Sequence, residues 1–157
     1  MRRWPVRVDE IILFLRLLAL ASGLTLAFQP AVNARLRSTI GDPFWAATIS
    51  FLTGTVALIV VALILRAPFP DFSNALRAPW YVWTGGLLGA IYVTSTIVCI
   101  PRLGAAQMLS LAVLGMMIGA LLIDQFGWFG LVIKPLSAFR VVGAILLIGG
   151  VAFMTRA

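Results

Sequence analysis

The sequence predicts an all-α integral membrane protein with five transmembrane helices, and three observations lead to this fold class. Hydrophobic residues make up 62% of the chain, its mean hydropathy is +1.08, and charged residues account for only 11%. The apolar residues form five runs of about 20 residues, the length at which a helix crosses a hydrocarbon core ~30 Å thick. Barrel strands would be about 10 residues long with alternating polarity, a pattern that this sequence lacks. Because backbone polar groups must be satisfied within the bilayer, the runs are expected to be helices.

The expected helices fill the chain, so residues 1–157 are predicted to form a single transmembrane domain. Helix breakers separate them: Asp42 and Pro43 begin the second helix, and Pro101 separates the third from the fourth. The first run exceeds the roughly 7–15 apolar residues of a signal peptide and lacks a small-residue cleavage site, so we expect it to stay in the mature protein. The expected helices are Leu17–Leu36 or already from Ile11, Phe44–Leu65, Trp80–Ile100, Leu103–Ile123 and Leu136–Met154.

The formal net charge of +7 and a pI near 11.4 would indicate a nucleic-acid partner in a soluble chain, but that interpretation fails here. The basic residues are spread over the connectors, which is how helix ends are flanked in a bilayer. We therefore expect lipid and not nucleic acid around this protein. The expected location is the inner (plasma) membrane, with several crossings.

The residue types present do not support a metal site or an enzyme active site. The chain has no histidine and a single cysteine, Cys99, inside an apolar run, so neither a disulfide framework nor a zinc site can be built. Paired carboxylates that could act as general acid and base are also missing. We expect no metal, no cofactor, no catalytic residue and no enzymatic activity.

The charge bias between the two membrane sides is weak. Five crossings place the termini on opposite sides, with seven basic residues on the N-terminal side and four on the other, which favours a cytoplasmic N-terminus. Three of the seven lie in the N-terminal tail, and without them the two sides are equal. A chain with this bias could insert in both orientations. The two sets are Arg2, Arg3, Arg7, Arg66, Arg77, Lys134 and Arg140 against Arg35, Arg37, Arg102 and Arg156.

Small residues mark the helix faces that are expected to pack closely. In two of the spans a pair of glycines stands four residues apart, the spacing that lets two helix backbones approach each other. The last span carries a pair two turns apart. Packing within the chain and dimerisation both fit such pairs. The glycines are Gly85, Gly89, Gly115, Gly119, Gly143 and Gly150.

Polar side chains within the spans need a partner or a purpose, because each costs free energy in hydrocarbon. The first helix carries Ser22, Thr25, Gln29 and Asn33 at successive gaps of 3, 4 and 4, which places them on one stripe, and Pro30 interrupts its backbone donors. This stripe is the best candidate for a substrate site. Serine and threonine in membrane helices usually bond back to the backbone, so they are weaker candidates. Further candidates for the cavity wall are Tyr92, Thr96, Gln107 and Ser110.

No acidic residue lies at the centre of a span. Coupling to protons, where it exists, would have to rest on Asp124 or Glu10, both near a span end. For Asp124 the alternative role is a helix cap or a partner for a nearby cation.

Several stretches together resemble the YdcZ-like family of the drug/metabolite transporter superfamily. The most specific features are Gln29 with Asn33, the PRLG motif at Pro101 and the IDQFG motif at Ile123. The sequence departs from the family's pattern at Met116 and Met117, where a polar residue is expected. The similar stretches are ASGLTLAFQPAVNARLRSTIGDPFWAATISFLTGT, PWYVWTGGLLGAIYV, PRLGAA, LLIDQFGWFG and KPLSAFRVVGAILLIGGV.

The resemblance implies a five-helix protomer equivalent to half of a ten-helix transporter whose halves are inverted repeats. Such a protomer is expected to work as an antiparallel dimer, either a homodimer or a heterodimer with a paralogue, and the weak charge bias agrees with two-way insertion. The predicted function is alternating-access transport of a small organic solute through a cavity at the dimer interface. A non-transporting membrane scaffold or assembly subunit is the alternative.

Overall fold

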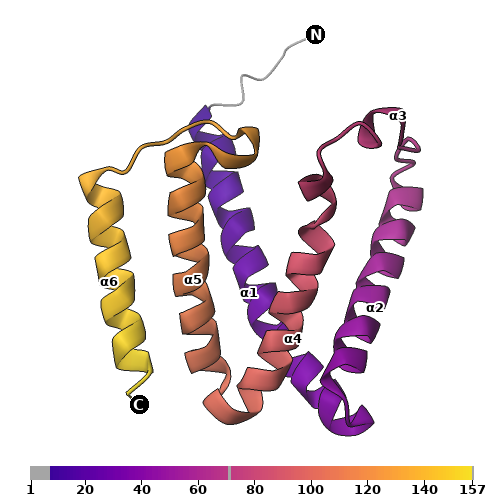
Figure 1. The fold of residues 1–157 in the computed structure, drawn as a ribbon, viewed down its shortest axis with the longest axis horizontal. Helices are drawn as coiled ribbons and strands as arrows, with labels where there is room; N and C mark the ends of the chain where they lie inside the picture. Colours follow the sequence, from indigo (N-terminus) through magenta and orange to yellow (C-terminus); the bar gives the residue numbers. More distant parts are fainter. Residues whose placement is uncertain (1–7, 71, 157) are drawn as a thin grey trace. The chain divides into compact units, whose positions relative to one another are not determined.

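The computed structural model describes residues 8–70 and 72–156, and within them every regular element is a helix. This confirms the all-α fold class. The three arginines of the N-terminal tail lie outside the described residues. The long helices are α1 (Val8–Ile40), α2 (Pro43–Ile64), α4 (Gly85–Leu103), α5 (Ala105–Phe126) and α6 (Ala138–Met154); short elements are α3 (Phe72–Ala75) and the 3-10 turns η1 (Trp80–Trp83) and η2 (Trp128–Gly130) (Figure 1).

Four helices, α1, α2, α4 and α5, are long and apolar enough to cross a membrane, with mean hydropathies between 1.5 and 2.4. α6 is also apolar but has 17 residues, which corresponds to about 25 Å of helix. This length is at the lower limit for a crossing, and local thinning of the bilayer accommodates such a helix. The chain is therefore an all-α membrane protein with four full-length spans and one short apolar helix.

All the long helices differ by at least one residue from the bounds expected from the sequence, and the largest differences are in α1 and α4. α4 begins at Gly85 and not at Trp80, because Trp80–Trp83 form the 3-10 turn η1. α1 begins at Val8 and ends at Ile40, so it extends beyond the apolar run at both ends. The acidic Asp9 and Glu10 in its first turn and Arg37 in its last turn match the polarity of the helix ends. α4 continues through Pro101 to Leu103, and the chain turns at Gly104, whose φ of 78° suits glycine.

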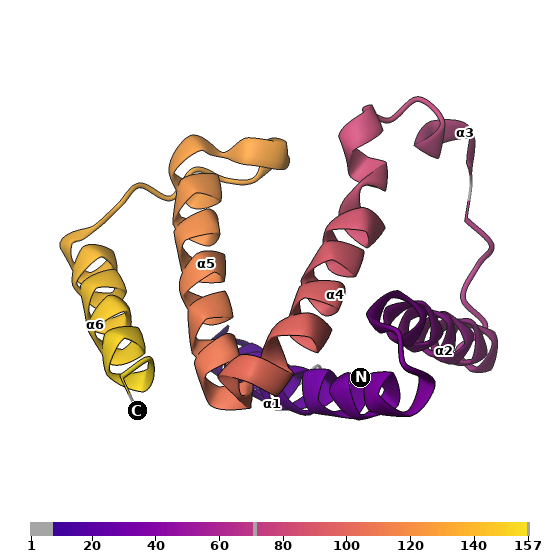
Figure 2. The same cartoon turned by 60° about the horizontal axis from the view of Figure 1, so that its bottom comes forward.

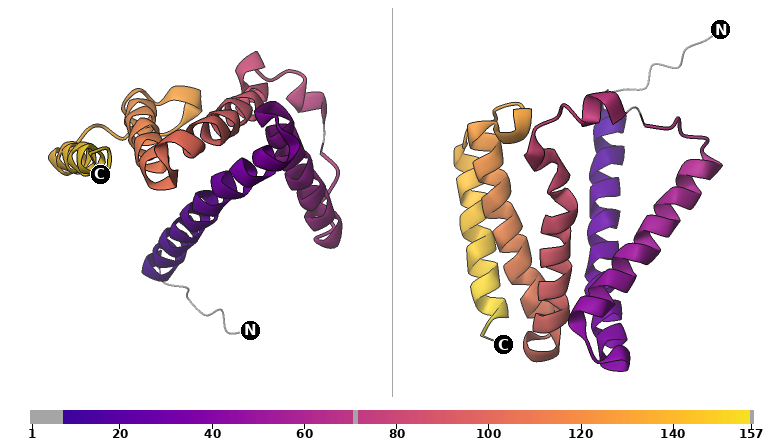
Figure 3. Two further views of the ribbon diagram at one scale, coloured as in Figure 1. Left: turned by 90° about the horizontal axis from the view of Figure 1, so that it is seen from below. Right: turned by 45° about the vertical axis from the view of Figure 1, so that its right-hand side comes forward.

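The described residues up to Val98 form one compact unit, in which α1 and α2 make a helical hairpin (Figure 3). Gly41 turns the chain with a φ of 85°, and the Asp42 carboxylate accepts a hydrogen bond of 2.9 Å from the backbone N–H of Trp45. Pro43 stands at the first helical position, where no backbone N–H is needed. The expectation that Asp42 and Pro43 start the second helix is confirmed. In Figure 2 the connector that contains α3 runs from the end of α2 to the start of α4.

The core of this unit lies where α2 meets α4. Ala46 and Ala47 of α2 contact Val93 and Ile97 of α4, and Leu36 and Tyr92 pack against this cluster. A second contact lies further along the two helices, where a Cβ on Gly89 would lie 3.2 Å from the Phe51 ring. Small side chains on one helix therefore receive larger ones from the other.

Residues 99–157 form the second compact unit, built from α5 and α6 (Figure 1). α5 ends at Gly127, whose φ is 62° and where a Cβ would lie 2.7 Å from the Ile133 side chain. The chain then passes through η2 and an extended segment, residues 131–137, before α6 begins. The Ser137 hydroxyl accepts a 3.4 Å hydrogen bond from the N–H of Arg140 at that start.

Most large apolar side chains of the described residues are exposed at the protein surface, for example Phe28, Leu58 and Phe139. A continuous apolar surface of this kind is not compatible with water. Lipid or another protein chain must cover it, which agrees with the assignment to the membrane.

Candidate substrate groove

A groove of about 430 Å³ lies between α1 and α2, and it contains the two amides of the predicted polar stripe. Gln29 and Asn33 stand one helical turn apart on α1, so both side chains reach the same side of the helix. The first unit alone supplies all the lining residues. They are Thr25, Phe28, Gln29, Val32, Asn33, Leu36, Ile49, Ser50 and Thr53.

Two of the five hydroxyl and amide side chains in the groove are already bonded to the backbone. The Thr25 hydroxyl donates to the carbonyl of Ser22 at 2.8 Å, and the Thr53 hydroxyl donates to that of Ser50 at 2.9 Å. Within the described residues, the side chains of Gln29 and Ser50 form no hydrogen bond. These two groups are therefore free to bind a polar molecule.

Asn33 is the unusual residue of the groove. It is only 4% exposed, and its Nδ2 atom has no hydrogen-bond partner among the described residues. Buried amides are nearly always bonded in folded proteins, because an unmade bond costs about 1–3 kcal/mol. The Asn33 amide is therefore the strongest candidate in the groove for a contact with a bound molecule.

Two of the predicted wall residues, Tyr92 and Thr96, belong to the core of the first unit and do not line the groove. Thr96 is 1% exposed, and its hydroxyl donates to the carbonyl of Val93 at 2.8 Å. Tyr92 packs against the core cluster. The spacing of polar residues along α4 could not distinguish a wall from a core face.

The other two predicted wall residues, Gln107 and Ser110, lie on α5 in the second unit. The Ser110 hydroxyl donates to the carbonyl of Gln107 at 2.9 Å, so it is engaged with its own helix. Both residues are half-buried.

The two acidic candidates for coupling have different surroundings. Glu10 lies exposed in the first turn of α1. The Asp124 carboxylate at the end of α5 forms an ion pair of 3.1 Å with Arg140 of α6, and each side chain is about one-third exposed (33% and 34%). The sequence predicts pairing with a nearby cation as one role of Asp124, and the structure identifies that cation as Arg140.

This ion pair belongs to a hydrogen-bond network that holds the extended segment, residues 131–137, against the end of α5. The backbone N–H of Lys134 donates to the carbonyl of Asp124 at 2.8 Å, and the Arg140 guanidinium donates to the carbonyl of Lys134 at 2.9 Å. The Gln125 amide oxygen accepts from the N–H of Leu136 at 2.8 Å. A separate groove of about 310 Å³ between α5 and α6 has the ion pair at its rim.

Of the six glycines predicted to pack, Gly89 meets a neighbour, the Phe51 ring. At the other five, a Cβ would meet nothing within 4 Å. These five are Gly85, Gly115, Gly119, Gly143 and Gly150.

One contact that sequence reasoning missed joins the end of α1 to α4. The Arg37 guanidinium donates a hydrogen bond of 3.1 Å to the backbone carbonyl of Ile97. In a regular helix this carbonyl would accept from the N–H of residue 101, which here is Pro101 and has no N–H. A proline inside a helical run was the signal, since it marks the carbonyl four residues earlier as lacking its donor.

Long apolar helices together with a groove lined by polar side chains are typical of small membrane transporters. A protein-family model described as "Putative inner membrane exporter, YdcZ" matches residues 14–153, and the chain therefore belongs to this DMT_YdcZ family. The chain is also 27% identical over 139 residues to "Inner membrane protein YdcZ" of Escherichia coli (strain K12), an alignment that covers 87% of this chain and 91% of that protein. No solved structure matches the chain.

Family membership confirms the resemblance drawn from the sequence motifs. It also supports the assignment of the chain as a multi-pass protein of the inner membrane that acts as a transporter and is surrounded by lipid.

Proposed function

We propose that the chain exports a small organic solute by alternating access and that the α1–α2 groove is its contribution to the substrate site. The observation that carries this proposal is the buried Asn33 amide, which lines the groove and lacks an acceptor. A solute with a carbonyl, ether or hydroxyl oxygen would accept from Asn33 and Gln29, while Phe28 and Ile49 would contact its apolar part.

The complete transporter in this proposal is an antiparallel dimer, of identical chains or of two paralogues. A volume of about 430 Å³ is at the lower end for a small-molecule site, so an inverted second protomer would complete the cavity around the solute. Rocking of the helices around that cavity would expose it to one side of the membrane at a time. Proton coupling at Asp124 would require its carboxylate to exchange Arg140 for a proton.

The first experiment asks whether the groove contains water, because a scaffold would seal it. Gln29→Cys and Asn33→Cys are made in a Cys99→Ser background and treated in intact cells with a membrane-impermeant methanethiosulfonate reagent. Both cysteines should react, and a matched cysteine at the exposed position Leu58 should not, because it faces lipid. Absence of reaction at 29 and 33 would favour the scaffold.

The second experiment tests transport itself. Cells that express the wild-type chain are challenged with a panel of growth-inhibitory organic compounds, and those to which it gives resistance are tested against Gln29→Ala and Asn33→Ala. Resistance should be lost in both variants while the amount of folded protein in the membrane is unchanged. Full resistance in both variants would refute the assignment of the groove.

A further inference from the structure

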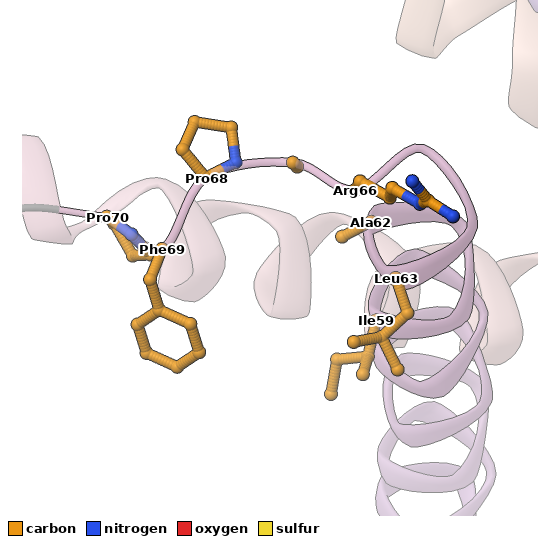
Figure 4. A pocket seen from close by; sticks show the side chains of 8 residues that line it. Ile59, Ala62, Leu63, Arg66, Pro68, Phe69 and Pro70 are labelled. Atoms are coloured by element: carbon orange, nitrogen blue, oxygen red, sulfur yellow. The ribbon is translucent and has the colours of Figure 1, made fainter.

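A second groove lies at the other end of α2, where the helix gives way to the connector (Figure 4). It has a volume of about 370 Å³. Ile59, Ala62 and Leu63 form its helix wall, and Figure 4 shows the Phe69 ring on the opposite side. Among the residues that the structure describes, Arg66 is the single charged one that lines it. The nearest residues of the two grooves on α2, Thr53 and Ile59, are about 9 Å apart along the helix, and Arg66 lies about 24 Å from Ser50.

The backbone places Arg66 at the point where the helix ends. Its N–H donates to the carbonyl of Leu63 at 3.1 Å, and the next N–H, that of Ala67, donates to the carbonyl of Ala62 at 2.9 Å. This pair of bonds is the Schellman motif, whose turning residue is usually glycine because it needs a positive φ. Arg66 adopts a φ of 51° there, so an arginine occupies a position where its side chain is disfavoured.

The order of chemical groups along the groove indicates what can bind in it. Ile59 and Leu63 lie one turn apart on the same face of a membrane-spanning helix, so they form an apolar wall that points toward the bilayer interior. The Arg66 guanidinium lies at the end of that helix (Figure 4). The ends of membrane-spanning helices meet the lipid headgroups, and basic residues are common there. Among residues 8–70 and 72–156, Arg66 forms no ion pair.

The exposed aromatic ring supports the same reading. Phe69 is 94% exposed, and it stands between Pro68 and Pro70, which restrict the backbone of the connector. An exposed ring across from an apolar helix face, with a guanidinium at one end, fits a ligand that has an acyl chain and an anionic head.

We propose that this groove binds an anionic phospholipid, with the headgroup phosphate on the Arg66 guanidinium and an acyl chain between Phe69 and the Ile59–Leu63 face. Arginine recognises phosphate through its planar fork of donors, and the apolar walls hold the chain without needing further polar contacts. The site is separate from the substrate groove and does not depend on its assignment.

Lipid retention by the purified full-length chain tests the proposal. The protein is mixed with equal amounts of dioleoyl phosphatidylglycerol and dioleoyl phosphatidylcholine in detergent, washed, and examined by native mass spectrometry. The wild-type chain should retain at least five-fold more phosphatidylglycerol than phosphatidylcholine. Equal retention of the two lipids would overturn the proposal.

Variants distinguish specific lipid binding in this groove from a general attraction of anionic lipid to positive charge. Arg66→Gln should abolish the preference, whereas Arg77→Gln should keep it, because Arg77 lies on the same connector but does not line the groove. Ala62→Phe should reduce phosphatidylglycerol retention at least five-fold by filling the groove while keeping Arg66. Equal loss in Arg66→Gln and Arg77→Gln, or full retention in Ala62→Phe, would refute the site.

Arg66→Gly tests whether a loss of lipid binding could result from loss of folding. Glycine suits a φ of 51°, so this variant should unfold at a higher temperature than the wild type in phosphatidylcholine micelles. Phosphatidylglycerol should raise the unfolding temperature of the wild type and leave that of Arg66→Gly unchanged. A response of Arg66→Gly equal to that of the wild type would contradict the role of the guanidinium.

Discussion

Replacement of Arg37 by methionine should destabilise the protein, because within residues 8–70 and 72–156 Arg37 is the only side-chain donor to the Ile97 carbonyl. Ile97 is fully buried, and Pro101 cannot supply the N–H that this carbonyl would otherwise receive. A hydrogen bond from a charged donor contributes about 1.5–3 kcal/mol, and a buried acceptor left without a partner costs about 1–3 kcal/mol. Because the Arg37 side chain is only half-buried, we expect a loss near the middle of this range, about 2 kcal/mol.

A second substitution tests the stated cause. Pro101→Ala restores the backbone N–H that points at the Ile97 carbonyl, so Arg37 becomes dispensable in this background. Arg37→Met should then cost less than about 0.5 kcal/mol, which gives a coupling of roughly 1.5 kcal/mol in the double-mutant cycle. The assay is equilibrium unfolding of the purified variants by dodecyl sulfate in mixed micelles, followed by circular dichroism.

The matched control is Arg35→Met. Arg35 also stands in the last turns of α1, is exposed, and donates no side-chain hydrogen bond within the described residues, so its replacement should change the unfolding free energy little. Equal destabilisation by Arg37→Met in the wild-type and Pro101→Ala backgrounds would refute the argument that arginine replaces the missing proline donor.

The remaining predictions each follow from one contact. Asn33→Leu should raise the free energy of unfolding by about 1–3 kcal/mol, because it removes an unpaired buried amide. The same variant should abolish export. A lower free energy of unfolding would mean that the amide is hydrogen-bonded in the membrane. Gly89→Leu should lower the free energy of unfolding by about 1–3 kcal/mol, because the new side chain would collide with Phe51. Gly86→Leu should leave this free energy unchanged, because Gly86 faces open space. Asp124→Asn should speed hydrogen exchange at the N–H of Lys134. The free energy of global unfolding should change by less than about 1 kcal/mol, since the ion pair is partly exposed. Unchanged exchange would show that the Asp124 carboxylate does not hold residues 131–137 against α5.

The helices could be predicted because lipid imposes a single strong rule on the chain. Within the bilayer a run of about 20 apolar residues satisfies its backbone only as a helix, so hydropathy located the long elements. The exact ends depend on other effects. α1 continues for several residues beyond its apolar run because polar residues at both ends suit the helix dipole, and α4 passes through Pro101 because a proline near a helix end removes only one bond.

The candidate groove could be predicted only on the helix that carries the polar stripe. Gln29 and Asn33 share a face by spacing alone, and the structure places both in the lining of one groove. Ser50 and Thr53 reach that groove because of how α2 packs on α1, which spacing along one helix does not determine. The same reason explains Tyr92 and Thr96, which follow the pattern of wall residues but belong to the core of the unit.

The unoccupied glycine positions support the proposed dimer by an argument about forces in lipid. Apolar side chains gain little from leaving lipid for a protein surface, so helix association must come from close packing, which small residues permit. Gly89 is already used within the chain, against Phe51. Gly143 and Gly150 on α6 leave open space beside the backbone, and at Gly143 this space belongs to the groove between α5 and α6. α6 is also the shortest apolar helix, and a short span is stabilised by association with neighbours. The face of α6 that carries these glycines is therefore where we expect the second protomer to pack.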